Sequence, residues 1–270
     1  MSAIINARSL ILEVTRKCNL HCAHCLRGDA QCVDMSKSTI DKLMPMLGKV
    51  SSVTFTGGEP SLNTGIIEYF FKRFEETHSY VPSFFVATNG IGKERQLELC
   101  RILMEAYANM DEGDRECCGL AISRDEFHDD SDVCNIAKAL CFYDNSKDMS
   151  NQQNSDWCIP EGRAMENGIG ANERKMKPDF YIDNEDDFID GDTPDVEMLY
   201  ISAKEEVNGE CDFSYEDIDE EKLCTLDTLP AYLEHLRLSS LPTTWQVESR
   251  KTDKNKKERV GRNIHPTRRI

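Results

Sequence analysis

Short apolar segments alternate with longer amphipathic ones through the first half of the chain, and this alternation most constrains the fold. The β-type runs cover residues 9–14, 53–56, 84–87 and 119–122. Helical patterns at about 64–77 and 93–110 separate the later runs. Strands that alternate with helices build parallel βα units. We therefore expect an α/β fold in which the polar residues after each strand gather at one edge of the sheet.

The chain contains 12 cysteines, which is many for an intracellular protein. Its N-terminal residues lack the pattern of a secretory signal, and no apolar run could span a bilayer, so we expect a cytoplasmic protein without membrane contact. In a reducing compartment, metal binding or catalysis explains cysteines better than disulfides do. We interpret Cys100, Cys134 and Cys141 as small apolar residues on the faces of helices.

Three of the cysteines follow the first predicted strand in one loop. Cys18, Cys22 and Cys25 have the spacing C-x3-C-x2-C, and such soft thiolate ligands suit an iron–sulfur cluster or zinc. A structural zinc site needs four ligands, and a nearby His21, His24 or Cys32 could supply the fourth, so zinc stays an alternative. On a four-iron cluster, three ligands would instead leave one iron open to a substrate or cofactor.

Polar or glycine-rich motifs also follow the next three predicted strands. Gly57-Gly58-Glu59-Pro60 combines glycines, which allow a ligand to approach the backbone, with a proline that stiffens the turn. An ordinary strand-to-helix turn is the alternative. The third strand ends in Thr88-Asn89-Gly90. After the fourth, Ser123 and Asp125 point the same way because alternate residues of an extended chain share a side.

These motifs, in this order, resemble the radical SAM superfamily. The resemblance implies a partial (βα)6 TIM-like barrel, a 4Fe-4S cluster on the three loop cysteines, and S-adenosylmethionine (SAM) on the open iron. Reductive cleavage of SAM would give a 5′-deoxyadenosyl radical that abstracts hydrogen from a substrate. A low-potential donor such as flavodoxin or ferredoxin would supply the electron. The sequence identifies neither the substrate nor the product, nor whether SAM is regenerated.

The resemblance also assigns roles to residues. His24 stands where the family usually has an aromatic residue, and a Gly-Arg pair in the expected place suggests that Arg163 binds the SAM carboxylate. His128 and Asp129 either face the substrate or cap a helix that begins near residue 131. No residue is assigned to substrate catalysis. The predicted SAM contacts are His24, Gly57, Gly58, Glu59, Pro60, Thr88, Asn89, Ser123, Asp125 and Arg163.

The second half of the chain matches the family less clearly. We expect a core domain over 1–182, an extension over 183–245 with a hairpin of two strands (196–203 and 207–213) and a helix at about 226–238, and a basic, disordered tail over 246–270. The hairpin resembles the start of a SPASM or twitch extension, which favours a peptide or protein substrate. Only Cys158, Cys211 and Cys224 are available for an auxiliary cluster, so we expect a single cluster and a structural Cys211.

The net charge of −17 argues against general binding to nucleic acid. The charge is uneven, because residues 183–221 are acidic and residues 250–269 are basic. Two other functions stay open. One is an RNA-modifying radical SAM enzyme that is anchored through the basic tail. The other is a non-catalytic iron–sulfur or zinc protein that uses the cysteine loop together with His24.

Overall fold

The computed structural model describes residues 3–128, 135–148, 158–170, 179–182 and 193–240. Within these ranges, eight strands form one sheet in the order β5-β4-β3-β2-β1-β6-β7-β8. The first six are parallel: β1 (Ile5–Thr15), β2 (Leu47–Gly57), β3 (Ser83–Thr88), β4 (Gly119–Ile122), β5 (Tyr143–Asp144) and β6 (Asp195–Ile201). The last two, β7 (Glu206–Asn208) and β8 (Cys224–Thr225), are antiparallel.

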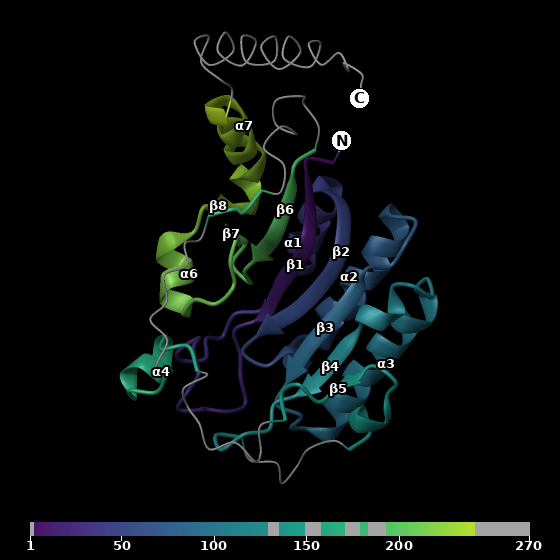
Figure 1. The fold of residues 1–270 in the computed structure, drawn as a ribbon, viewed down its shortest axis with the longest axis vertical. Coiled ribbons are helices and arrows are strands. Elements are labelled where there is room, and N and C mark those ends of the chain that lie inside the picture. Colours follow the sequence, from purple (N-terminus) through teal and green to yellow (C-terminus); the bar gives the residue numbers. More distant parts are fainter. Residues whose placement is uncertain (1–2, 129–134, 149–157, 171–178, 183–192, 241–270) are drawn as a thin grey trace, which may run out of the picture.

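Strand β1 lies in the middle of the sheet and is hydrogen-bonded on both sides. Leu10 is the register partner of Val53 in β2 and of Leu199 in β6, and all three are fully buried. Because β6 returns to β1 and not to β5, the sheet stays open in the part of the chain that the structure describes (Figure 1). The predicted α/β fold with a parallel, incomplete barrel is confirmed.

The helices form where apolar residues recur at helical spacing. Along α2, Ile66, Ile67, Phe70, Phe71 and Phe74 are all buried, and Phe70 packs on Phe55 of β2 with ring centroids 5.5 Å apart. Burial of each such ring contributes roughly 1.5–3 kcal/mol to the stability of the helix–sheet contact. The helices are α1 (Lys37–Leu43), α2 (Thr64–Thr77), α3 (Lys93–Asn109), α4 (Gly162–Glu166), α6 (Tyr215–Glu221) and α7 (Leu229–Ser240).

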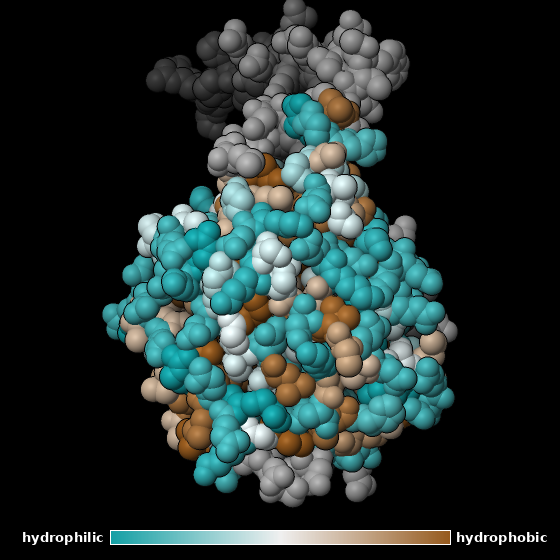
Figure 2. Space-filling view, turned by 180° about the vertical axis from the view of Figure 1, so that it is seen from behind, coloured by the Kyte–Doolittle hydropathy of each residue, from teal (hydrophilic) through white to brown (hydrophobic). Residues whose placement is uncertain are grey.

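Short 3-10 turns connect several of these elements. They are η1 (Met44–Met46), η2 (Pro60–Asn63), η3 (Arg115–Cys117), η4 (Ala137–Ala139) and η6 (Leu226–Thr228). The face of the molecule opposite to that in Figure 1 is mostly hydrophilic, with small hydrophobic spots, as Figure 2 shows. No helix among the described residues is long and apolar enough to cross a membrane.

The predicted elements of the first half are confirmed with small changes. Helix α2 has the predicted bounds, α3 ends one residue early, and Cys100 is buried on α3 as expected. The prediction for Cys141 is wrong. It is exposed, because Tyr143 N bonds Leu140 O in a turn that leads into β5.

The predicted hairpin at 196–213 is present, but its second strand is shorter than expected. Strand β7 ends at Asn208, and residues 211–213 are irregular. A side chain in place of Gly209, the residue after β7, would lie 2.2 Å from the carbonyl oxygen of Asp179, so glycine is required where these two segments meet. Asp129, Cys134, the predicted helix start near residue 131, the acidic stretch 183–192 and the basic tail lie outside the described residues.

Candidate active site

The carboxyl ends of the parallel strands meet at the lower end of Figure 1 and surround a cavity of about 640 Å³. Several predicted site residues line this cavity, and the loops after β1, β2 and β4 supply them. A cavity at the carboxyl ends of parallel strands is where α/β folds bind their ligands. The predicted residues that line it are His24, Cys25, Gly57, Gly58, Pro60, Ser123 and Asp125.

The loop with the three cysteines begins directly after β1. The thiols of Cys18, Cys22 and Cys25 are all half-buried. Cys25 N bonds Cys22 O at 3.2 Å, which closes the turn between the second and third cysteines. Burial raises the pKa of the Cys18 thiol, the Leu20 amide, 3.4 Å from Sγ, counteracts this in part, and the negative charge of Glu59 adds to the rise. Such a thiol becomes a thiolate most readily on a metal.

Helix α4 and the residue after it hold the cysteine loop by hydrogen bonds to the backbone carbonyls of that loop. The Arg163 amide donates to Cys25 O at 2.9 Å, and its guanidinium donates to Cys22 O at 3.0 Å and to Asp29 at 2.9 Å. Asn167 donates to Ala23 O at 3.0 Å. Arg163 is buried, so these bonds fix the turn that carries the second and third cysteines. The predicted contact between Arg163 and the carboxylate of SAM stays a prediction.

The GGEP loop packs on the entrance to the cysteine loop. Gly58 N donates to Thr15 O and Glu59 N to Lys17 O, both at 2.8 Å. A Cβ at Gly57 would lie 2.0 Å from Thr15 O, and one at Gly58 would lie 2.2 Å from Lys17 O. Gly57 also has φ +142°, which disfavours any side chain. Two glycines are therefore required for this approach of backbone to backbone.

Glu59 joins the GGEP loop to the end of β3. Its buried carboxylate accepts hydrogen bonds from the Thr88 hydroxyl at 2.5 Å, the Asn89 amide at 2.8 Å and the Ser61 amide at 3.0 Å. The Asn89 side chain donates in turn to Asn19 Oδ1, within the cysteine loop, at 2.9 Å. Glu59, Thr88 and Asn89 thus lie behind the cavity wall and connect the loops that form it.

The loop after β4 brings two histidines and a carboxylate together. His128 Nδ1 and Asp125 Oδ1 are 2.7 Å apart, and the His24 ring stacks on Phe127 with centroids 4.3 Å apart. Burial lowers the pKa of His128, but the Asp125 carboxylate and the Cys22 thiol raise it more, to about 9. Burial raises the pKa of Asp125, and His128 more than reverses this. Burial lowers the pKa of His24. His128 therefore faces the cavity as a cation beside Cys22.

The C-terminal segment supplies the opposite wall of the cavity. Cys211 and Asp212 line it, together with Arg27, whose guanidinium donates to Phe213 O at 2.8 Å. Burial raises the pKa of Cys211 to about 12, so its thiol stays protonated at neutral pH. Cys158 also lines the cavity, while Cys224 lies half-buried in β8. The prediction that these three cysteines carry no second cluster stays a prediction.

A buried polar cluster ties this C-terminal segment to the cysteine loop. Arg16 is fully buried and pairs with Glu13 at 2.6 Å, Asp219 at 2.6 Å and Glu206 at 3.3 Å. The Tyr200 hydroxyl donates to Glu13, whose carboxylate also accepts from Ala203 N at 3.0 Å. Because Arg16 precedes Cys18 by two residues, this cluster sets the direction in which the chain enters the cysteine loop.

The residues around the cavity fit a 4Fe-4S cluster and SAM. The donor set is three soft thiolates, which suits iron–sulfur. Gly57 and Gly58 line the cavity and present backbone to it. The buried Tyr215 hydroxyl has no hydrogen-bond partner in the described part of the chain. A loop that offers three soft ligands matches a group rich in sulfur.

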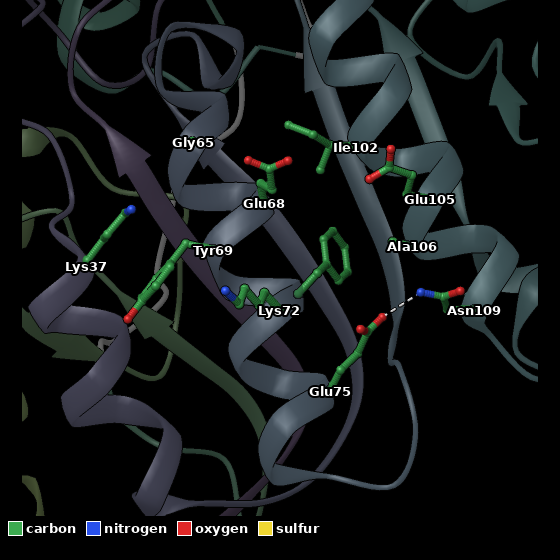
Figure 3. A pocket seen from close by; sticks show the side chains of 11 residues that line it. Lys37, Gly65, Glu68, Tyr69, Lys72, Glu75, Ile102, Glu105, Ala106 and Asn109 are labelled. Carbon is green, nitrogen blue, oxygen red and sulfur yellow. Dashed lines mark hydrogen bonds between the residues drawn. The ribbon is translucent and has the colours of Figure 1, made fainter.

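A second cavity, of about 510 Å³, lies between the outer helices α1, α2 and α3 (Figure 3). On its α1 side the Lys37 ammonium lies 4.9 Å from the centre of the Tyr69 ring, and Glu75 accepts a 2.9 Å hydrogen bond from Asn109. None of the predicted site residues lines this cavity. Two of its carboxylates, Glu68 and Glu105, bond Arg101. We assign it no ligand.

Comparisons with known proteins match part of the chain. Residues 12–139 match the family model of the radical SAM superfamily. The chain is 32% identical over 138 residues to GTP 3′,8-cyclase of Chlorobaculum tepidum and 40% identical over 65 residues to an uncharacterized protein of Methanocaldococcus jannaschii. These matches cover 48% and 23% of the chain but only 38% and 22% of the relatives.

Two solved structures resemble the chain more distantly. Native anSMEcpe with bound AdoMet has a TM-score of 0.46 at 14% identity and covers 84% of this chain and 80% of its own. Streptococcus suis SuiB bound to the precursor peptide SuiA has a TM-score of 0.30 at 16% identity and covers 44% and 24%. Identities this low carry no information on substrate.

Proposed function

We propose that the chain is a radical SAM enzyme that binds a 4Fe-4S cluster through Cys18, Cys22 and Cys25 and cleaves SAM reductively. The observation that carries this proposal is the contact between two loops. The GGEP loop donates two 2.8 Å backbone hydrogen bonds to the entrance of the cysteine loop, beside an open cavity. A zinc or redox-sensor loop explains the thiols, but it needs neither the paired glycines nor the cavity.

Bound together, the cluster and SAM would supply hydrogen abstraction by a 5′-deoxyadenosyl radical. The chain's own residues would orient the reactants. Gly57 and Gly58 leave room for SAM to approach the backbone, and the stacked His24 and Phe127 rings offer a flat face to an adenine. Ser123 and Asp125 supply polar atoms at the far side of the same cavity.

The hydrogen bonds of Glu59, Thr88, Asn89 and Arg163 support a positioning role in addition to the predicted contacts with SAM. Thr88 and Asn89 both donate to the Glu59 carboxylate, and Arg163 donates to Cys22 O in the cysteine loop. Residues that hold both loops determine where the cluster and SAM meet. A shift of about 1 Å at such a site costs roughly 100-fold in rate.

For the substrate we propose a peptide or protein side chain. The C-terminal segment that follows the β6–β7 hairpin forms one wall of the cavity through Cys211 and Asp212, which favours a substrate that this segment helps to bind. The chain spans less than two fifths of the length of the curated relatives that it matches, so their activities do not transfer. Electrons would come from a low-potential donor such as flavodoxin or ferredoxin.

The proposal is tested by loading the protein anaerobically with iron and sulfide, reducing it and adding SAM. We expect 5′-deoxyadenosine, detected by mass spectrometry, from the wild type and from Cys100→Ala, whose thiol is buried on α3 away from the site. Cys22→Ala should give none. If a fully loaded and reduced wild type failed to bind SAM, the proposal would be wrong and the non-catalytic alternative would stand.

The substrate class needs its own measurement. Uncoupled cleavage of SAM gives a background of 5′-deoxyadenosine, and the correct substrate class should raise the rate well above this background. We would compare peptide pools with nucleoside triphosphates and with RNA. A response to RNA with a steep salt dependence, lost without residues 246–270, would favour the RNA-modifying alternative over the peptide proposal.

A further inference from the structure

Tyr215 is a buried side chain whose hydroxyl has no hydrogen-bond partner in the described part of the chain. The residue is 2% exposed, and its hydroxyl is buried as well. A buried hydroxyl without a partner costs about 1–3 kcal/mol. A ligand that accepts a hydrogen bond from this hydroxyl in the functional protein would explain why the chain itself supplies no partner.

The position of Tyr215 relative to the cysteine loop is fixed at two points. Its backbone amide donates to Arg27 O at 3.0 Å, two residues after Cys25. Its ring lies under the Arg16 guanidinium, 4.6 Å from the centroid and two residues before Cys18. Both ends of the cysteine loop therefore contact this residue, which belongs to α6 and is 190 residues further along the chain than Cys25.

The surroundings of the hydroxyl explain why it is a donor and why it has no partner. The pKa of Tyr215 is raised by burial first and then by the negative charge of Glu13, although Arg27 and Arg16 counteract it. Tyr215 thus keeps its proton, and its backbone bond to Arg27 O holds it beside the segment that carries Cys25. The Glu13 carboxylate is already occupied by Arg16, Tyr200 and Ala203.

We propose that the Tyr215 hydroxyl donates a hydrogen bond to the Cys25 sulfur when that sulfur binds the iron–sulfur cluster, and so sets the reduction potential of the cluster. This inference rests on the proposed function. A donor to a cluster sulfur stabilises the reduced form, which carries one more negative charge, and hydrogen bonds to sulfur are among the determinants of cluster potentials. Tyr215 is a positioning and tuning residue that does not itself touch the substrate.

The test is Tyr215→Phe, which removes only the hydroxyl. In the loaded protein we expect iron content equal to that of the wild type and a more negative reduction potential in an EPR-monitored titration. The ratio of reduced to oxidised cluster at a fixed potential should fall roughly threefold to tenfold, and tenfold is about 59 mV for one electron. An unchanged potential in a fully loaded variant would overturn the inference and leave the proposed function intact.

Tyr200→Phe is the matched control. It also removes a buried hydroxyl from the same polar cluster, but that hydroxyl already bonds Glu13. We expect this control to lower stability without shifting the potential. Equal shifts of the potential in both variants would overturn the inference, because they would show that the loss of either buried hydroxyl changes the potential in the same way. A wild type that takes up no cluster would overturn both the proposed function and the inference.

The cluster-free protein gives an independent check. Without a cluster the Tyr215 hydroxyl has no partner, so Tyr215→Phe should unfold at the same urea concentration as the wild type or at a higher one. A lower midpoint would show that the hydroxyl is already bonded within the protein, and the inference would fail.

Discussion

The Glu59 carboxylate, in the loop after β2, accepts a 2.5 Å hydrogen bond from the hydroxyl of Thr88, the last residue of β3. This bond makes the GGEP loop and the end of β3 a single unit, which Asn89 extends to Asn19 in the cysteine loop. Three segments of the site are therefore held together by direct contacts of the chain's own residues. Preorganisation of this kind keeps a site from reorganising during the reaction.

Glu59→Gln should weaken this unit. The replacement puts an amide NH₂ group where the carboxylate accepts from Thr88, Asn89 and Ser61, so one buried donor loses its partner. We expect the free energy of unfolding to fall by about 1–3 kcal/mol in urea titrations. Glu68→Gln, at an exposed ion pair with Arg101, should change it by less than about 1 kcal/mol. Equal effects of the two variants would contradict the role given to Glu59.

Gly58→Ala should displace the GGEP loop from the cysteine loop. The new Cβ would lie 2.2 Å from Lys17 O, so backbone must move, at a cost of roughly 1–3 kcal/mol. SAM affinity, measured by equilibrium dialysis on the loaded protein, should fall with it. In Gly65→Ala nothing lies within 4 Å of the new methyl group, and this control on α2 should be neutral or up to about 1 kcal/mol more stable. Unchanged SAM binding by Gly58→Ala would refute the contact between the loops.

Arg16→Met should be the most damaging of these substitutions. It leaves the fully buried Glu13 and the partly buried Glu206 and Asp219 without their shared cation. Loss of one partner from a buried ion cluster costs about 3–5 kcal/mol. Arg101→Met removes an exposed cation that also has three acidic partners, and should cost less than about 1 kcal/mol. Thermal unfolding of both variants measures this difference in stability. Similar losses of stability would mean that the burial of Arg16 is unimportant for the fold.

The His128–Asp125 pair should make the stability of the cluster-free protein depend on pH. The pKa of His128 in the folded chain is about 9, above its unfolded value of roughly 6.5, so the imidazolium stabilises the fold fully below pH 6.5. This contribution should be lost as the pH rises toward 9. The difference in unfolding free energy between the wild type and His128→Gln should shrink by roughly 1–2 kcal/mol over that window. A constant difference would contradict the raised pKa.

The strands and helices of the first half follow from the sequence because local patterns determine them. The apolar run before Cys18 and the helical spacing of Ile66, Phe70 and Phe74 each specify their element without help from distant residues. The cysteine loop and the GGEP loop could also be predicted, because the residues that define each motif are close together in the sequence. Short elements such as α1 and α6 were missed, since tertiary contacts and not a long periodic pattern support them.

Other parts of the site had no local signal. Arg16 and Arg27 look like ordinary surface cations in the sequence, yet both are buried by residues near 200–219. Tyr215 and Asp212 gain their importance only because the chain returns to the cysteine loop through β6 and β7. The position of His128 after the fourth strand indicated a place in the site. From the sequence alone, a role as a helix cap explained that position equally well.

The position of β6 beside β1 determines when the site can form during synthesis. The cysteine loop leaves the ribosome early, whereas the residues that fix its two ends come much later: the bond from Arg16 to Asp219 spans 203 residues. Contacts this distant in sequence form slowly. A nascent chain would therefore expose three thiols long before their surroundings exist, and iron delivered at that stage would meet an unfinished binding site.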